Sequence, residues 1–298
     1  MSFSRNTAIK KRGLGPLFLF VFPALVVIFA VSIYPVIFSL YLSFTDRTLL
    51  YLRAPRFVGF SNYSNVVSDK LFWHSLKLQL SFMVFAIPLE LFIGFLGALL
   101  FLKDFPLCRL LRSLLMLPVF ILPVVSGLTW RLMLQPGYGL LASFFNSVSL
   151  GPKAWLADTK YAFVTVVLQD VWRMWPFMFM IIYAGLSSLP SEYLEAAQID
   201  GAKFWQRVFH IIVPLLRPVM TMAVLLRMID ALRIFSEVYV MTYGGPANAT
   251  LLLPLYIHKQ AFEFGKVAYA SAASVFLLAV SLALSFYLVR ASFRGEVS

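Results

Sequence analysis

The sequence predicts an all-α membrane protein with six transmembrane helices, because it combines a high apolar content, few charges and several long apolar segments. The chain has 298 residues, of which 61% are hydrophobic and 13% are charged, and its mean hydropathy is +0.85. A soluble domain carries about 25% charged residues, so these side chains are too few to cover a water-exposed surface. A lipid-exposed segment must satisfy its backbone hydrogen bonds internally, so we expect each apolar segment to be a helix.

Six segments are long enough to cross a bilayer, which requires about 20 mostly apolar residues per helix. We expect these spans at residues 17–43, 72–102, 113–134, 161–186, 216–242 and 268–290. Proline within a span predicts a kink, tolerated where neighbouring helices cover the freed carbonyl group, and this applies to Pro23, Pro35, Pro88, Pro123 and Pro176. We expect residues 1–298 to form a single transmembrane domain.

The net charge of +12 would suggest nucleic acid as a partner of a soluble protein. Here the positive residues lie mostly between apolar segments, which favours contact with anionic lipid headgroups over nucleic acid. The segments expected in the cytoplasm hold more Lys and Arg than the outer loops do. The orientation is set by the basic cluster before the first span, Arg5, Lys10, Lys11 and Arg12. Both termini are therefore predicted to be cytoplasmic.

The sequence contains no arrangement of residues that indicates catalysis, a metal site or nucleotide binding. Cys108 is the only cysteine, and His74, His210 and His258 are far apart without ligand spacing. The chain has no Gly-x-x-x-x-Gly-Lys-Ser/Thr loop for ATP phosphates and no Ser/His/Asp set. We therefore expect a protein that is not an enzyme and that binds no metal or cofactor of its own.

The loop between the fourth and fifth spans, about residues 187–215, is long and amphipathic. Ser191 could cap a helix that carries Glu195 near its positive dipole end. Gly201 would end this helix, and a second short helix would begin near Ala202. Such a helix pair is suited to inserting into a groove on a cytoplasmic partner.

Within this loop, "EAAQIDG", nine further residues and "IIVP" resemble the EAA loop of binding-protein-dependent ABC importer permeases. The family pattern is EAA, three residues, Gly, nine residues and Ile-x-Leu-Pro, and Val213 departs from it by standing in place of Leu. The resemblance implies the type I ABC importer permease fold with a cytoplasmic coupling-helix loop. The residues that it implies in docking onto ATPase subunits are Glu195, Ala196, Ala197, Asp200 and Gly201.

Three further segments resemble the carbohydrate branch of that family, which includes maltose-, trehalose- and glycerol-phosphate-type permeases. They read "FVGFSNYSNV", "WRMWPFMFMIIYAGLSSLP" and "RIFSEVYVMTYGGP", and the Gly-Gly-Pro turn is similar to the first permease of a pair. The resemblance implies ATP-driven uptake of a sugar or sugar derivative across a bacterial inner membrane. The implied partners are a second homologous permease, an ATPase dimer that binds ATP and Mg, and an extracytoplasmic solute-binding protein.

Charged residues interrupt two of the predicted spans. Span four carries Asp170 and Arg173, and span five carries Arg227, Asp230, Arg233 and Glu237. An intramembrane charge costs at least about 2.5 kcal/mol and normally faces a bundle interior or a water-filled cavity. The spacing in span five permits a ladder of alternating sign along one helix.

Two interpretations of these charges are open. The ladder could hold the spans together, or the residues could line the solute path. Alignment with the maltose-type permease implies sugar-facing positions near Arg173, Met174, Phe177, Arg227, Asp230, Ala231 and Ile234. A carboxylate and a guanidinium can both bind hydroxyls, and two arginines could hold a carboxylate, sulfonate or phosphate. The sequence thus leaves both a neutral and an acidic saccharide open.

The alternative function is a self-sufficient secondary transporter driven by an ion gradient. Such transporters are built from internal repeats with broken helices at corresponding positions, and the sequence contains no such repeat. An EAA-like loop has no role in that mechanism, so we favour the ATP-driven importer.

Overall fold

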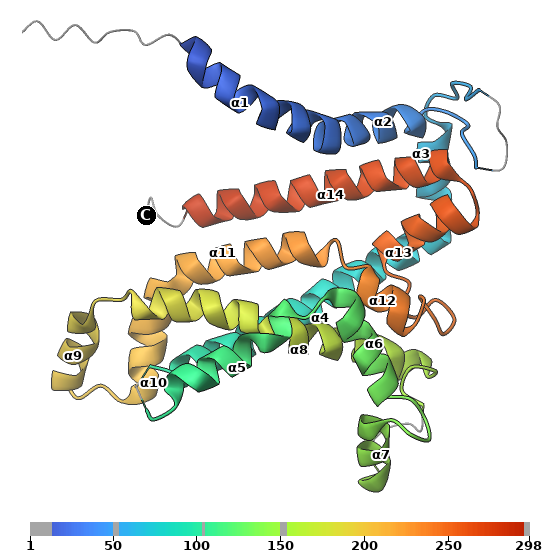
Figure 1. The fold of residues 1–298 in the computed structure, drawn as a ribbon. Coiled ribbons are helices and arrows are strands. Elements are labelled where there is room, and N and C mark those ends of the chain that lie inside the picture. Colours follow the sequence, from blue (N-terminus) through green and yellow to red (C-terminus); the bar gives the residue numbers. More distant parts are fainter. Residues whose placement is uncertain (1–13, 50–53, 103–104, 150–153, 295–298) are drawn as a thin grey trace, which may run out of the picture.

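The computed structural model describes residues 14–49, 54–102, 105–149 and 154–294. Within these ranges the regular elements are helices, and one isolated bridge joins Thr45 to Phe57. Figure 1 shows long helices that run side by side, with shorter helices at both ends. The basic cluster on which the predicted orientation rests, at residues 5–12, lies outside the described residues.

The first, second and sixth predicted spans agree closely with long helical segments. The first consists of α1 (Leu14–Ile28), a π-helical turn (Phe29–Ile33) and α2 (Tyr34–Ser43). The second is α4 (Lys70–Leu100), and the sixth is α14 (Val267–Arg294). α2 packs against α14, whereas α1 diverges from the other helices (Figure 1).

The third predicted span, 113–134, is not one continuous helix. It consists of α5 (Cys108–Phe120) and α6 (Pro123–Met133), which meet at an angle of 95°. Leu122 has ψ 135°, the non-helical conformation favoured for the residue before a proline, and Pro123 occupies the first helical position of α6. The predicted kink at Pro123 is thus a complete break.

The helix α8 (Thr159–Ser187) corresponds to the fourth predicted span and packs against α4, α5, α6 and α11. Its approach to α4 is close at Gly94, where an added Cβ would lie 2.7 Å from the Met178 Cβ and from the Phe179 backbone nitrogen. The buried apolar residues on both helices, including Phe82, Ala86 and Ile182, form the centre of the hydrophobic core.

The fifth predicted span, 216–242, has different boundaries in the structure. A continuous helical segment, Phe204–Ala231, comprises α10 (Phe204–Arg207), a π-helical turn (Val208–Ile212) and α11 (Val213–Ala231). The chain then bends, and α12 (Ser236–Met241) is separate. The second loop helix, expected to be short, is therefore continuous with the fifth span and runs through Pro214. This proline lies in the first turn of α11, directly after the π-helical turn.

Four described helical segments are long and apolar enough to cross a membrane, namely Val21–Ser43, Lys70–Leu100, Phe204–Ala231 and Val267–Phe286. The bent pair α5–α6 would make a fifth span. α8 has the necessary length of 29 residues but is less apolar, because it carries Gln169, Asp170 and Arg173. All three side chains are buried within the protein.

The shorter helices lie at two opposite ends of the molecule. Figure 1 shows α3 (Ser61–Ser68), α12 and α13 (Leu253–His258) at one end. At the other end lie α9 (Ser191–Ile199) and α10, together with the start of α1 and the end of α14. The segments expected as outer loops and the loop expected in the cytoplasm are therefore on opposite sides.

Candidate functional site: a buried ion cluster and an exposed helix pair

Four carboxylates and two guanidiniums meet where α4, α8, α11 and α12 come together, and we call them the ion cluster. Its members are Glu90, Asp170, Arg173, Arg227, Asp230 and Glu237. All except Asp230 are buried. Ionised groups out of water are stable only when they are paired and hydrogen-bonded, so the geometry of these contacts decides what the cluster can do.

Arg227, on α11, contacts three carboxylates and is 1% exposed. Its Nε donates to Oε2 of Glu90 at 2.7 Å, and its Nη2 donates to Oε1 of Glu90 at 3.0 Å. Nη2 also donates to Asp170, and Nη1 donates to Oδ2 of Asp230 at 3.1 Å. Arg227 therefore joins α4, α8 and its own helix through charge-assisted hydrogen bonds.

Arg173, on α8, contacts the remaining carboxylate of the cluster. Its Nη2 lies 2.9 Å from Oε1 of Glu237 and 3.4 Å from Oδ1 of Asp170. Glu237 belongs to α12, which follows the bend after α11. The predicted ladder along one helix thus consists only of the pair Arg227–Asp230. Beyond Ala231, Glu237 pairs with Arg173 on α8 instead. The ladder fails there because the helix that would have aligned Arg233 with Glu237 has ended.

The structure brings Arg173, Arg227 and Asp230 together, as the predicted solute path requires. The other predicted path residues differ in exposure: Met174, Ala231 and Ile234 are buried in this chain, and Phe177 is partly buried. Asp230 is the exposed member of the cluster, with 54% of its side chain accessible. Contact of any of these residues with a solute stays a prediction.

Glu90 is a member of the cluster that the sequence reasoning missed. It stands alone within "FAIPLELFIGF", in the middle of the second predicted span. A single carboxylate in such a segment needs a buried cationic partner, and this signal was available from the sequence. Its partner, 137 positions further along the chain, was not predictable from helical spacing.

Neutral polar side chains extend the contacts around the cluster. Gln79 on α4 donates from Nε2 to the carbonyl oxygen of Ala231 at 2.9 Å, at the end of α11. Gln169 on α8 donates from Nε2 to Oγ of Ser126 on α6 at 2.8 Å. These buried hydrogen bonds fix the positions of the helix end and of α6 relative to α8.

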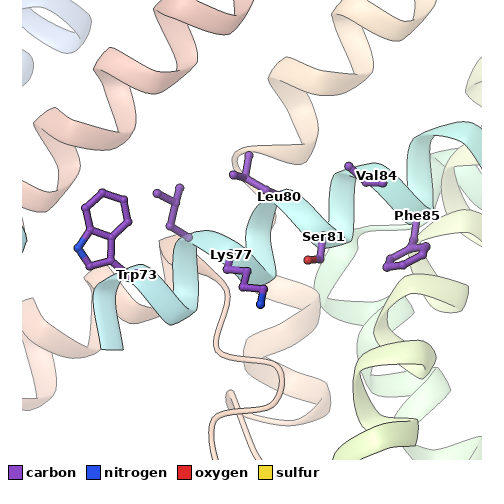
Figure 2. A pocket seen from close by; sticks show the side chains of 7 residues that line it. Trp73, Lys77, Leu80, Ser81, Val84 and Phe85 are labelled. Atoms are coloured by element: carbon purple, nitrogen blue, oxygen red, sulfur yellow. The ribbon is translucent and has the colours of Figure 1, made fainter. Parts of the chain in front are cut away.

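A shallow pocket of about 410 Å³ lies along the N-terminal half of α4 (Figure 2). Figure 2 shows Trp73, Lys77, Leu80, Ser81, Val84 and Phe85 along one side of the helix. Lys77 lies roughly 20 Å before Glu90 along the axis, at 1.5 Å per residue. None of the residues that line this pocket belongs to the ion cluster.

The predicted coupling residues lie on and just after α9. Glu195, Ala196, Asp200 and Gly201 are exposed, whereas Ala197 is buried against the rest of the molecule. Gly201 has φ +75° with no atom near a Cβ position, so the positive φ is what this turn requires of the residue. Glu192 lies in the first turn of α9, but Ser191, expected as the cap, is the first helical residue, and no side-chain capping hydrogen bond is made there.

At the opposite end, Asp69 joins α4, α13 and α14. Its Oδ1 accepts from the Leu71 N–H at 2.7 Å, and its Oδ2 accepts from the hydroxyls of Tyr256 at 2.7 Å and Tyr269 at 2.9 Å. Burial opposes ionisation of Asp69, but these donors outweigh it, so the pKa of Asp69 lies below its ordinary value. Asp69 therefore caps α4 as a carboxylate.

A bundle of apolar helices that encloses an ion cluster and exposes a helix pair at one end is typical of a membrane transport permease. The family model described as "Binding-protein-dependent transport system inner membrane component" matches residues 80–294. The chain belongs to this family. This membership confirms the predicted class and fold, and its members are transport components, not enzymes.

Relatives and solved structures agree with this assignment. The trehalose/maltose transport system permease MalF of Thermococcus litoralis is 35% identical over 272 residues, which is 91% of each chain. The sulfoquinovosyl glycerol transport system permease SmoG of Agrobacterium fabrum is 31% identical, over 88% of this chain and 85% of that protein. A crystal structure of a bacterial ABC transporter that imports alginate matches with a TM-score of 0.81 at 18% identity, over 94% and 96% of the two chains.

Proposed function

We propose that the chain is the transmembrane permease subunit of an ATP-driven importer that takes up a sugar or sugar derivative delivered by an extracytoplasmic binding protein. The observation that carries the proposal is the exposed helix pair around Gly201, which carries the EAA-like sequence. The relatives named for trehalose, maltose and sulfoquinovosyl glycerol support a sugar-like solute.

The helix pair exposes large apolar side chains, which favour contact with a protein partner over contact with water. Ile199 is 87% exposed, and four aromatic residues around the turn are exposed as well, Tyr193, Phe204, Trp205 and Phe209. Exposed apolar groups next to Glu195 and Asp200 form a surface that could insert into a groove. We propose that this surface binds the ATPase dimer, which carries the ATP and Mg.

A second permease would cover apolar surface that this chain leaves open. None of the residues in the apolar window of Val21–Ser43 is buried within the chain. The pair α5–α6 also exposes a series of large apolar residues, Leu110, Leu114, Leu117, Phe120, Val124 and Leu128. We propose that lipid covers part of these surfaces and that a homologous permease covers the rest.

The proposed topology has six membrane crossings, with α8 and the α5–α6 pair each counted as one. The helix pair α9–α10 then faces the cytoplasm, and both chain ends lie on the same side. The location of α9, the start of α1 and the end of α14 at one end of the molecule supports this arrangement (Figure 1). We propose the bacterial inner membrane as the location.

We propose that the solute passes beside Asp230, along the surface where α8 and α11 meet the partner permease. The path residues are those implied by the family alignment, Arg173, Met174, Phe177, Arg227, Asp230, Ala231 and Ile234. Some residues of this set are buried in the single chain. In this conformation we propose that they hold Asp230 in position and do not contact the solute themselves.

Uptake of labelled trehalose into proteoliposomes tests the proposal. The vesicles contain this chain, its partner permease, the ATPases and the binding protein. We expect uptake that requires ATP and stops when the ATPase is inactivated by substitution of its phosphate-binding lysine. Uptake that persists with the inactive ATPase and collapses with an ionophore would favour the ion-coupled transporter instead.

A further inference from the structure

We infer that the path through this permease selects neutral, polyhydroxylated solutes and disfavours anionic ones. The ion cluster presents the exposed carboxylate of Asp230 to the path, whereas both of its guanidiniums are largely buried. The inference rests on the proposed function and specifies the chemical class of solute for the same site.

The guanidinium of Arg227 is not available to a solute anion. Two of its nitrogens bind Glu90, one of these also binds Asp170, and the third binds Asp230. With Arg227 1% exposed, a solute anion would have to displace the buried carboxylates of Glu90 and Asp170 from this guanidinium. That exchange would leave unpaired charges out of water, which is strongly unfavourable.

Arg173 is also largely buried, but only its Nη2 is paired with carboxylates, and its Nε has no hydrogen-bond partner among the described residues. It is 9% exposed, and its Nη2 lies between Glu237 and Asp170. The carboxylates of the cluster outnumber its guanidiniums four to two, so its formal charge is negative. The member of the cluster nearest to an approaching anion is the exposed carboxylate of Asp230, which repels it.

Asp230 is the part of the cluster that a solute can contact. Arg227 Nη1 holds its Oδ2 at 3.1 Å, and 54% of the side chain is accessible. A carboxylate in the membrane does not face lipid, so this surface must border water, solute or the partner permease. A carboxylate can accept hydrogen bonds from sugar hydroxyls, and it repels carboxylate, sulfonate and phosphate groups.

Other cations near the cluster do not reverse this preference. Arg233, three residues after Asp230, lines a groove of about 330 Å³ against Ser274, Leu277 and Ser281 of α14. Asp230 does not line that groove. Lys77 is roughly 20 Å away along α4 from the level of Glu90.

The relatives leave the charge of the solute open. MalF is named for neutral disaccharides, whereas SmoG is named for a glycoside whose sugar carries a sulfonate. The two are similarly close to this chain in sequence, so overall identity does not choose between them. The geometry of the ion cluster favours the neutral solute, because the exposed charge of the cluster is negative.

Equilibrium dialysis with matched sugars tests the inference. The purified complex of both permeases and the ATPases, without the binding protein, is dialysed against labelled trehalose or trehalose 6-phosphate. The two probes differ by one dianionic group. We expect the complex to retain trehalose and to bind trehalose 6-phosphate at least about ten-fold more weakly, because like charges in contact repel.

Asp230→Asn removes the charge and keeps the shape and an amide that can hydrogen-bond hydroxyls. We expect this variant to lose most of the discrimination between the two sugars and to weaken trehalose binding only a few-fold. Glu263→Gln, which removes an exposed carboxylate near the outer end, is the matched control and should keep the wild-type ratio. Arg233→Gln should also keep it.

Equal or tighter binding of trehalose 6-phosphate by the wild-type complex would overturn the inference, as would an unchanged ratio in Asp230→Asn. Retention of neither sugar would also contradict it, provided that the binding protein still stimulates ATP hydrolysis. That stimulation separates the two proposals, because its absence in the wild-type complex would count against the proposed function itself.

Discussion

Arg227 on α11 and Glu90 on α4 form a two-point ion pair, with N–O distances of 2.7 and 3.0 Å between the guanidinium and the two carboxylate oxygens. Both side chains are buried, and the planar guanidinium matches the carboxylate in geometry. The pair links helices that are far apart in the sequence. Of the three carboxylates that contact Arg227, Asp230 is the exposed one, whereas Glu90 and Asp170 are buried.

Glu90→Gln should destabilise the protein more than Asp230→Asn. Breaking a buried pair costs about 3–5 kcal/mol, and we expect the lower value for Glu90→Gln because Asp170 and Asp230 still contact Arg227. Asp230 is half exposed, so its loss should cost about 1 kcal/mol or less. The measurement is the thermal unfolding midpoint of the purified complex in detergent. Equal destabilisation by the two variants would contradict the proposed hierarchy of contacts.

Gly201→Val should impair coupling, whereas Gly201→Asn should be mild. The φ of +75° costs a residue with a Cβ about 1–2 kcal/mol, and more for a β-branched side chain, whereas Asn adopts this region readily. We expect Gly201→Val to insert normally but to lose most of the ATP hydrolysis stimulated by the binding protein. The site has room for a Cβ, so the expected loss of coupling comes from backbone strain and not from a steric clash. Normal stimulation in Gly201→Val would refute the role of this turn.

Single cysteines should establish the orientation. In a Cys108→Ala background, Lys203→Cys should react with a membrane-impermeant maleimide only in inverted vesicles, and Ala247→Cys only in intact spheroplasts. Both positions are exposed in the structure, so lack of access to the correct side is the expected reason for protection. Reaction of Lys203→Cys from outside would reverse the proposed topology.

The stability that the hydrogen bonds of Asp69 contribute should depend on pH only at low pH. The pKa of Asp69 is lowered in the folded protein, so its contribution to stability is present above the ordinary carboxyl pKa, about 3.9. This contribution is lost as the pH falls through the lower, folded-state pKa. Asp69→Asn should lower the unfolding midpoint at pH 7, and its difference from wild type should shrink below about pH 4. A difference that is constant over this range would show that ionisation of Asp69 contributes nothing.

The sequence by itself determined the class of protein and the local features of the coupling loop. Apolar segment length identified the helices, because the bilayer sets a minimum length that short-range patterns reveal directly. The EAA spacing and Gly201 identified the helix pair, because a turn with positive φ is a local requirement of the chain. The i, i+3 pair of Arg227 and Asp230 was likewise readable from helical geometry.

Only the tertiary structure decided which charges pair across helices. Glu90 meets Arg227, and Glu237 meets Arg173, because α4, α8, α11 and α12 converge, and sequence spacing carries no information about that convergence. The break of the third span and the end of α11 at Ala231 likewise depend on how neighbouring helices pack. The buried arginines and the exposed Asp230 follow from this packing, since burial is a property of the assembled bundle and not of a residue's place in the chain.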